Sequence, residues 1–173
     1  MRSHLVFTFI GDDKPGLVES ISRIVNEHRA NWLDSRLSQL AGKFAGIIQV
    51  EVDERETAPL VAALEGLRNT GLTVVVERGD GKLSTESKLT DQLTLLGLDR
   101  PGIVRDVSQA LAEHSINVLE LRTSIVRAAM TGEPMFDASA TIEYDAETDL
   151  DRLVTDLEAI STELGIDIEL GED

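Results

Sequence analysis

The sequence predicts an α+β fold in two tandem copies, each a four-stranded antiparallel sheet with two helices on one face. Three observations support this prediction. The second half of the chain repeats the first, and each half shows the same succession of strand and helix periods. The chain has 173 residues, 42% of them apolar, which is enough to bury two small cores.

The repeat defines the two copies. A displacement of 86 residues aligns residues 8–38 with residues 94–124, and 13 of these 31 pairs are identical. The displacement then grows from 86 to 92 residues, so the second copy carries six extra residues, in the stretch that contains Met130 and Met135. Two copies at this spacing indicate tandem domains rather than a solenoid. We expect a first domain at residues 1–78, a short flexible linker at residues 79–88 and a second domain at residues 89–173.

The elements follow in the same order in each copy. Apolar runs at residues 5–10 and 93–98 predict a first buried strand, and apolar residues at helical spacing then predict helices that start near residues 17 and 103. Two strands joined by a hairpin turn come next, at residues 32–40 and 44–52 in the first copy and at residues 118–126 and 136–144 in the second. Amphipathic helices at residues 58–69 and 150–162 lead to short final strands at residues 72–77 and 166–170. The order β-α-β-β-α-β, with right-handed crossovers, is the ferredoxin-like arrangement.

Composition argues against several classes of function. The net charge is −16, from 16 Lys and Arg against 32 Asp and Glu, and it opposes binding to nucleic acids and to anionic membranes. The chain has no cysteine, which excludes disulfides and thiolate metal sites and fits a cytoplasmic location. The apolar runs are too short for a signal peptide or a membrane span. The three histidines do not have metal-ligand spacing, and we expect no metal and no cofactor.

A similar loop, GDDKPG and GLDRPG, precedes the first helix of each copy. Pro15 and Pro101 suit the first helical turn, and Asp13 and Asp99 are expected to cap it. The glycine that follows leaves the backbone amides open to a carboxylate or phosphate at the positive end of the helix dipole. Most helices begin without a ligand, so on the loop alone we prefer the structural explanation. Gly102, as a helix-starting residue, is then expected to tolerate alanine.

An asparagine recurs at the start of the second strand, as Asn31 and Asn117. Asparagine at such a junction is commonly a turn former, but its amide could also serve a polar ligand.

The combination resembles the ACT domain family. The resemblance rests on D-x-P-G before an apolar helix, with an asparagine about fifteen residues later at the start of the second strand, and it covers nearly the whole chain in two copies. ACT domains are regulatory modules that bind amino acids or other small metabolites, usually at an interface between two such domains. A chain of two ACT domains is similar to the glycine cleavage system transcriptional repressor family.

The resemblance implies a non-enzymatic regulator. It is expected to bind an amino acid, with glycine as a candidate, and to control transcription through a protein partner, as a homodimer without direct contact to nucleic acid or membrane. Serine-binding members often have asparagine at the acid position of the loop. The aspartate in this chain can accept hydrogen bonds from the ammonium group of an amino acid, but it cannot donate to the ligand's carboxylate. Donors to that carboxylate must therefore come from the backbone. The ligand-binding residues carried over are Asp13, Pro15, Gly16, Leu17 and Asn31, with Asp99, Pro101, Gly102, Ile103 and Asn117.

Other paired residues have plainer explanations. His28 and His114 are expected to interact with the end of a helix, and Arg36 and Arg122 to pair with acids on an exposed strand. Trp32, the only tryptophan, faces Val118 in the repeat and is expected to be a partly buried anchor. The insertion around Met130 is a candidate partner contact, with a disordered tip as the alternative.

Two other functions compete with the regulator. One is a small ferredoxin-like hydrolase of phosphate or acyl-phosphate esters that uses Arg100 and Asn117, although no general base or nucleophile stands near them in the pattern. The other is RNA binding, which shares the strand order but requires basic charge and surface aromatic residues.

Overall fold

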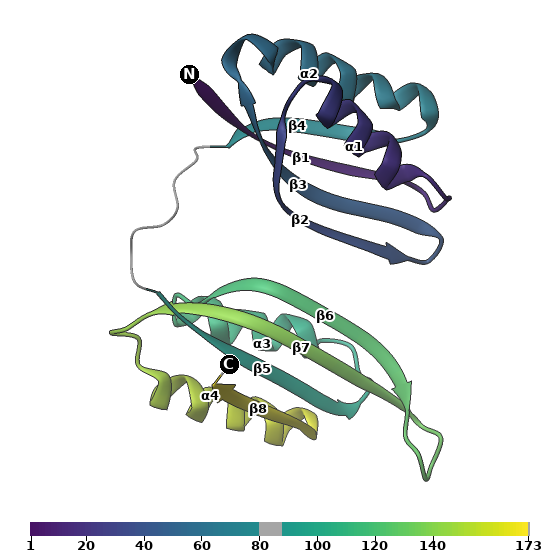
Figure 1. Ribbon diagram of the computed structural model, residues 1–173. Helices are drawn as coiled ribbons and strands as arrows, with labels where there is room; N and C mark the ends of the chain where they lie inside the picture. The colour runs from purple at the N-terminus through teal and green to yellow at the C-terminus, as the bar shows by residue number, and fades with distance from the viewer. Residues whose placement is uncertain (80–87, 173) are drawn as a thin grey trace. The chain divides into compact units, whose positions relative to one another are not determined.

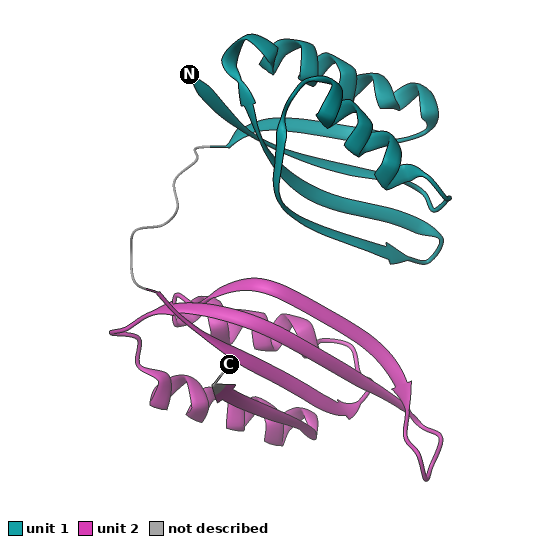
Figure 2. Ribbon diagram, viewed as in Figure 1, with its two compact units in different colours: residues 1–83 teal, residues 84–173 magenta. Residues whose placement is uncertain are grey.

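The computed structural model describes residues 1–79 and 88–172, in two compact units whose residues are 1–83 and 84–173 (Figures 1 and 2). The predicted linker at residues 79–88 falls almost wholly outside the described residues.

Both units have the predicted βαββαβ order, and the α+β fold is confirmed (Figure 1). The first unit consists of β1 (Arg2–Asp12), α1 (Leu17–Glu27), β2 (Asn31–Leu40), β3 (Lys43–Asp53), α2 (Glu54–Gly66), a 3-10 turn η1 (Leu67–Thr70) and β4 (Thr73–Gly79). The second consists of β5 (Lys88–Leu98), α3 (Ile103–Glu113), β6 (Asn117–Arg127), β7 (Pro134–Asp145), α4 (Leu150–Leu164) and β8 (Ile166–Glu172).

Each unit is one four-stranded antiparallel sheet with its two helices on the same face. The strand orders are β2-β3-β1-β4 and β6-β7-β5-β8. Alternate residues of the central strands face the helices, as the period of two in β1 and β5 predicts. The opposite face of each sheet, which we term the open face, carries no helix from the described residues of its own unit (Figure 1).

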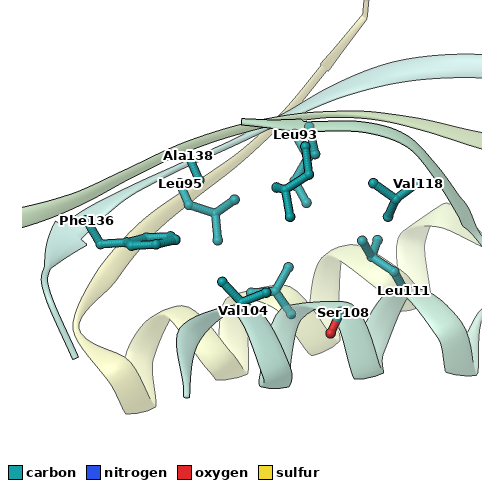
Figure 3. Close-up of a pocket in the computed structure, with 11 residues that line it drawn as sticks. Leu93, Leu95, Val104, Ser108, Leu111, Val118, Phe136 and Ala138 are labelled. Atoms are coloured by element: carbon teal, nitrogen blue, oxygen red, sulfur yellow. The ribbon is translucent and has the colours of Figure 1, made fainter. Parts of the chain in front are cut away.

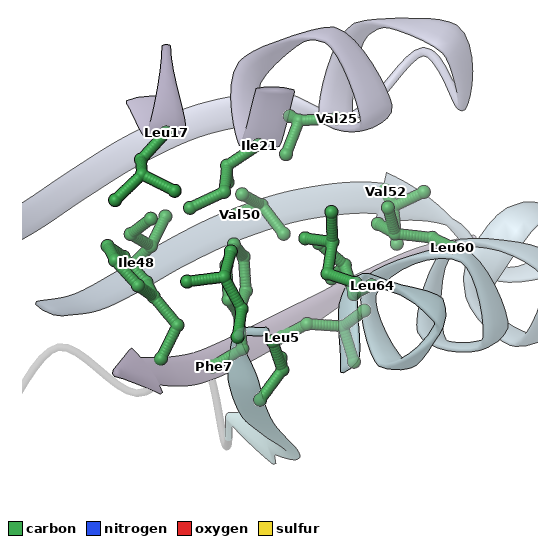
Figure 4. Close-up of a cluster of buried hydrophobic side chains, with 14 residues drawn as sticks. Leu5, Phe7, Leu17, Ile21, Val25, Ile48, Val50, Val52, Leu60 and Leu64 are labelled. Carbon is green, nitrogen blue, oxygen red and sulfur yellow. The ribbon is translucent and has the colours of Figure 1, made fainter. Parts of the chain in front are cut away.

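The cores lie between the sheets and the helices. In the first unit, side chains from β1, β3, α1 and α2 interlock, among them the fully buried Phe7, Ile21, Ile48 and Leu60 (Figure 4). Burial of this apolar surface is the main force that holds the helices to the sheet, because the helices are too short to be stable alone in water.

The two hairpins differ as the repeat predicts. In the first unit, Ala41 (φ 49°) and Gly42 (φ 77°) form a two-residue turn whose left-handed backbone matches the twist of the strands. In the second, the loop of residues 128–133 is closed by the N–H of Ala128, which donates to the carbonyl of Glu133 at 2.9 Å. Met130 at the tip of this loop is 98% exposed.

The first helix of each unit starts differently from the prediction. Gly16 and Gly102 are the N-cap residues, with φ of 90° and 105°, so Asp13 and Asp99 do not cap these helices and the prolines precede the helix. The aspartate caps lie instead on the second helix of each unit. Asp53 accepts the N–H of Arg55 at 3.0 Å, and Asp149 accepts the N–H of Arg152 at 3.1 Å.

Candidate functional site

The D-x-P-G loops connect the ends of β1 and β5 to α1 and α3. In both loops the N-cap is a glycine, which offers no side-chain acceptor to the amides of the first helical turn. The carbonyl of Gly16 accepts the N–H of Ser20, and that of Gly102 accepts the N–H of Asp106, both at 2.9 Å. Each loop therefore presents uncapped amides at the positive end of a helix, which is an arrangement suited to an anion.

The aspartates of the loops are held by their backbones. The N–H of Asp13 donates to the carbonyl of Gly42 at 2.9 Å, and the N–H of Asp99 donates to that of Pro134 at 3.1 Å. These bonds fix each loop to the hairpin of its own unit, while the two carboxylates stay exposed. Lys14 donates from Nζ to the carbonyl of Thr70 at 3.1 Å, which ties the first loop to η1 as well.

Charged groups next to the loops are already paired. Lys43 donates to Asp12, and this hydrogen bond together with the charge of Lys43 lowers the pKa of the Asp12 carboxyl. In the second unit Arg105 pairs with Asp106 at 2.6 Å, which raises the pKa of the Arg105 guanidinium. Asp106 Oδ2 and Arg105 Nη2 lie 3.5 and 3.6 Å from the position that a Cβ at Gly102 would occupy.

Leu17 and Ile103 follow the glycines, but their side chains belong to the cores. They are 5% and 1% exposed. Only their backbone amides are available to a ligand at the loop.

The asparagines lie far from the loops of their own units. Asn31 pairs in register with Glu51, which in turn opposes His4, whereas the loop starts after Asp12. The two rows are eight steps apart along β1, or about 26 Å at about 3.3 Å per residue. Asn117 has the same place in the second unit, where it pairs in register with Glu143, which in turn opposes Thr90. The structure therefore does not bring the loop and the asparagine of one unit together.

The remaining paired residues behave as the sequence predicts. His28 and His114 are the C-cap residues of α1 and α3, and their rings also contact acids of the neighbouring helices, with His114 Nε2 2.8 Å from Asp156 Oδ2. Arg36 and Arg122 pair with acids two residues earlier on the same strand, Asp34 and Glu120, each at 2.7 Å. Trp32 is partly buried against the first core.

An apolar pocket in the second unit was not predicted from the sequence. It lies between α3 and the helix-facing side of the sheet, with a cavity volume of about 40 Å³ (Figure 3). Its walls are Leu93, Leu95, Val104, Val107, Ser108, Leu111, Val118, Leu121, Phe136, Ala138 and Ala140. The signal that could have found it is the repeat itself, because several of these positions hold larger residues in the first copy.

Within residues 1–79 and 88–172, no three His, Asp or Glu side chains are grouped as a metal site would require. In that same part of the chain, no helix has the length and apolar character needed to cross a membrane.

The comparisons with known proteins cover both units. A family model described as the ACT domain matches residues 3–77 and 92–171. The glycine cleavage system transcriptional repressor of Escherichia coli is 24% identical over 169 residues, with 94% of this chain and 86% of the relative covered. A UPF0237 protein of Methanopyrus kandleri is 32% identical over 76 residues, which are 44% of this chain and 79% of the relative. Among solved structures, an unknown protein from Galdieria sulphuraria matches with a TM-score of 0.89 and 27% identity, over 100% of this chain and 99% of that one.

Proposed function

The chain belongs to the ACT domain family, and we propose that it is a non-enzymatic regulatory protein whose ACT domains bind an amino acid and pass the signal to a protein partner that controls transcription. The named relative from Escherichia coli supports the regulatory part of this proposal, and its name makes glycine an amino acid to test first. We place the protein in the cytoplasm, in keeping with a chain that has no cysteine.

The observation that carries the proposal is the duplicated loop. In both units a glycine with positive φ starts the first helix without a side-chain cap, whereas an aspartate caps the second helix. A carboxylate of an amino acid would complete the first helix as Asp53 completes α2, and it would gain from the helix dipole. The exposed carboxylates of Asp13 and Asp99 suit the ammonium group of the same ligand.

The separation of loop and asparagine determines the form of the site. Since about 26 Å lies between them within a unit, a ligand that uses both must lie between two ACT domains. The loop of one domain then meets the asparagine of another. We propose that this other domain belongs to a second copy of the chain.

The two competing functions fit the structure less well. Arg100 lies in the loop of the second unit and Asn117 at the opposite end of its sheet, so they cannot share one substrate within that unit. RNA recognition on such a sheet requires aromatic residues on its open face. All six aromatic residues, namely Phe7, Phe9, Trp32, Phe44, Phe136 and Tyr144, belong to the two cores or pack against them.

Titration calorimetry of the full chain with each of the twenty amino acids tests the proposal. Asn31→Ala and Asn117→Ala remove one hydrogen bond to a charged ligand group, which costs about 1.5 to 3 kcal/mol, so affinity should fall about tenfold to more than a hundredfold in at least one of them. Asn26→Ala on the exposed surface of α1 is the matched control and should leave affinity unchanged. Binding to none of the twenty amino acids would refute the proposal.

A further inference from the structure

The pocket between α3 and the sheet is a gap in the core of the second unit, and the repeat explains how it arises. The positions that fill this space in the first unit hold Phe7, Phe9, Trp32 and Ile48, and the corresponding residues of the second unit are Leu93, Leu95, Val118 and Ala140. All four changes are from a larger to a smaller side chain. Three other wall residues, Leu111, Leu121 and Ala138, are larger than their counterparts Val25, Ser35 and Gly46, but they do not close the space. A well-packed core does not tolerate such losses without leaving space.

The first unit shows how tightly the same place is packed. A methyl group at Gly46 would lie 2.7 Å from Leu37 Cδ2 and 3.1 Å from Phe9 Cε1. Phe9 also packs on Phe44, with ring centroids 5.7 Å apart. In the second unit the residue at the position of Gly46 is Ala138, and Phe136 faces a leucine instead of a ring. The ring of Phe9, which fills this place in the first unit, is thus replaced in the second unit by the side chain of Leu95 and the single methyl group of Ala138.

The walls of the pocket select an apolar occupant. Among the described residues that line the pocket, only Ser108 has a polar side chain (Figure 3). Its hydroxyl donates to the carbonyl of Arg105 at 3.1 Å. A charged or amide group inside would therefore lose its hydrogen bonds to water without replacement. Three wall residues, Val104, Val118 and Leu121, are 45%, 38% and 48% exposed, so the pocket opens between α3 and β6.

The volume limits the size of the occupant. One water-sized group needs about 10–15 Å³ by this measure, so a cavity of about 40 Å³ holds about three or four such groups. The side chains of valine, leucine and methionine have this size, and an aromatic ring is larger. Glycine has no side chain to place there.

One end of the pocket lies at the loop of the second unit. Phe136 opposes Gly97, which lies at the end of β5 two residues before the loop's Asp99, and Val104 is the second residue of α3. A ligand whose carboxylate meets the amides after Gly102 therefore has the pocket beside it.

We propose that this pocket receives the aliphatic side chain of the amino acid effector, of the size of valine, leucine or methionine, and that the second unit is the one that sets effector specificity. The inference rests on the proposed function, that the ACT domains bind an amino acid. If this proposal holds, burial of the methyl and methylene groups of the effector is a main source of affinity. The protein should then bind aliphatic amino acids more tightly than glycine, which has no side chain to bury.

The test fills the pocket with the residues of the first copy. Val118→Trp and Ala140→Ile in the full chain are titrated by calorimetry with L-leucine, L-methionine, L-valine and glycine. The unaltered protein should bind at least one of the three aliphatic amino acids about 100-fold more tightly than glycine. Each filled variant should lose at least about tenfold of that affinity.

Val154→Trp is the matched control. Val154 is 37% exposed, against 38% for Val118, and it lies on α4 outside the pocket walls. Its affinity for the aliphatic amino acids should stay within about twofold. If a filled variant fails to fold, Leu121→Ser is the alternative, because it introduces the residue of the first copy without added volume. It should weaken the binding of aliphatic amino acids and leave the affinity for glycine unchanged.

The outcomes separate the two proposals. Glycine bound as tightly as leucine, with filled variants that bind as well as the unaltered protein, would overturn the pocket proposal and leave amino acid binding in place. Filled variants that gain thermal stability but keep their affinity for leucine would show that the pocket is only a packing defect of the core. That result would also overturn the pocket proposal. Binding of none of these amino acids, or of any other, would remove both.

Discussion

At the scale of single residues, one buried polar pair distinguishes the two cores. Tyr144 donates from its hydroxyl to Asp91 Oδ2 at 2.6 Å, and the two residues are 6% and 9% exposed. The corresponding residues of the first unit are Val52 and Leu5, which are both apolar. The second core therefore contains a hydrogen-bonded pair at positions where the first core has apolar side chains.

We expect Tyr144→Phe to destabilise the protein by about 1 to 3 kcal/mol, because it leaves a buried carboxyl without this donor. Denaturant unfolding measures the loss. The double variant Asp91→Leu with Tyr144→Phe should recover most of it, since replacing both partners by apolar groups is nearly neutral. A double variant less stable than Tyr144→Phe alone would contradict this account.

Gly16 illustrates what the sequence could not predict at this scale. The D-x-P-G pattern correctly indicates a helix start, but not that the glycine has φ of 90°. Helix propensity favours alanine over glycine only inside a helix, and the expected tolerance of Gly102 for alanine is wrong for the same reason, since its φ is 105°.

Gly16→Ala should cost about 1 to 2 kcal/mol of stability, the conformational cost of left-handed backbone for an L-residue. Among the described residues, leaving out the chain neighbours of Gly16, no atom lies within 4 Å of the position of the new methyl, so steric contact adds little. Gly66→Ala is the control, because Gly66 has φ of −60° at the end of α2 and equally open space. It should hold or raise stability, and equal losses from both changes would contradict the prediction.

At the scale of the elements, the two second helices show where local capping decides a boundary. The apolar period predicts a helix at residues 58–69, but α2 begins four residues earlier, at Glu54, because Asp53 caps it. Pro59 lies inside this helix, whereas the apolar period places it at the start. Periodicity thus finds the α-helices and strands but not η1 as a separate element, and the capping side chain sets where α2 begins.

The cap on α2 should depend on pH. The N–H of Arg55 bonded to Asp53 lowers the pKa of this carboxyl, with help from the charges of the N-terminus, Arg55 and Arg2. A lowered pKa in the folded state stabilises the protein above the unfolded value of about 3.9, and this contribution is lost as the pH falls through the folded value.

Asp53→Ala should therefore lower the melting temperature at pH 7, and the difference from the unaltered protein should shrink below pH of about 3.9. Asp53→Asn keeps an acceptor for the Arg55 amide but cannot titrate, so near neutral pH it should cost less than alanine. Thermal unfolding followed by circular dichroism across the acid range up to neutral pH measures both. A difference that does not change with pH would mean that the carboxylate charge is not involved.

At the scale of the whole molecule, the sequence predicts the architecture because the repeat supplies two independent records of the same fold. It could not predict the arrangement of the candidate site, since loop and asparagine are near in sequence but lie at opposite ends of a strand. The size differences between the two copies are a signal of the pocket, but only the folded core shows that these side chains surround one space.

The open faces of the two sheets differ in a way that bears on assembly. In the first unit, Thr8 opposes both Ile47 and Val75, so these side chains share the open face, where they are 45% and 49% exposed. The position of Ile47 corresponds to Ser139 in the second unit, and that of Val6 to Gln92, whose amide donates to Thr141 at 3.0 Å. The open face of the first sheet therefore has an apolar patch at Ile47 and Val75, beside the ion pair of Arg36 and Asp34, whereas the matching positions of the second sheet are polar.

We expect the chain to form a homodimer through the open face of the first unit. Symmetric pairing of two chains is the commonest way to cover such a surface, and it also brings in the further ACT domains that the proposed site needs. Light scattering at tens of micromolar should give twice the 18.9 kDa chain mass. Ile47→Lys should weaken the dimer at least about tenfold, because it places a charge in an apolar interface. Ser139→Lys, the same change at the matching position of the second unit, should leave the dimer intact. A monomeric unaltered protein, or equal effects of the two lysines, would rule this interface out.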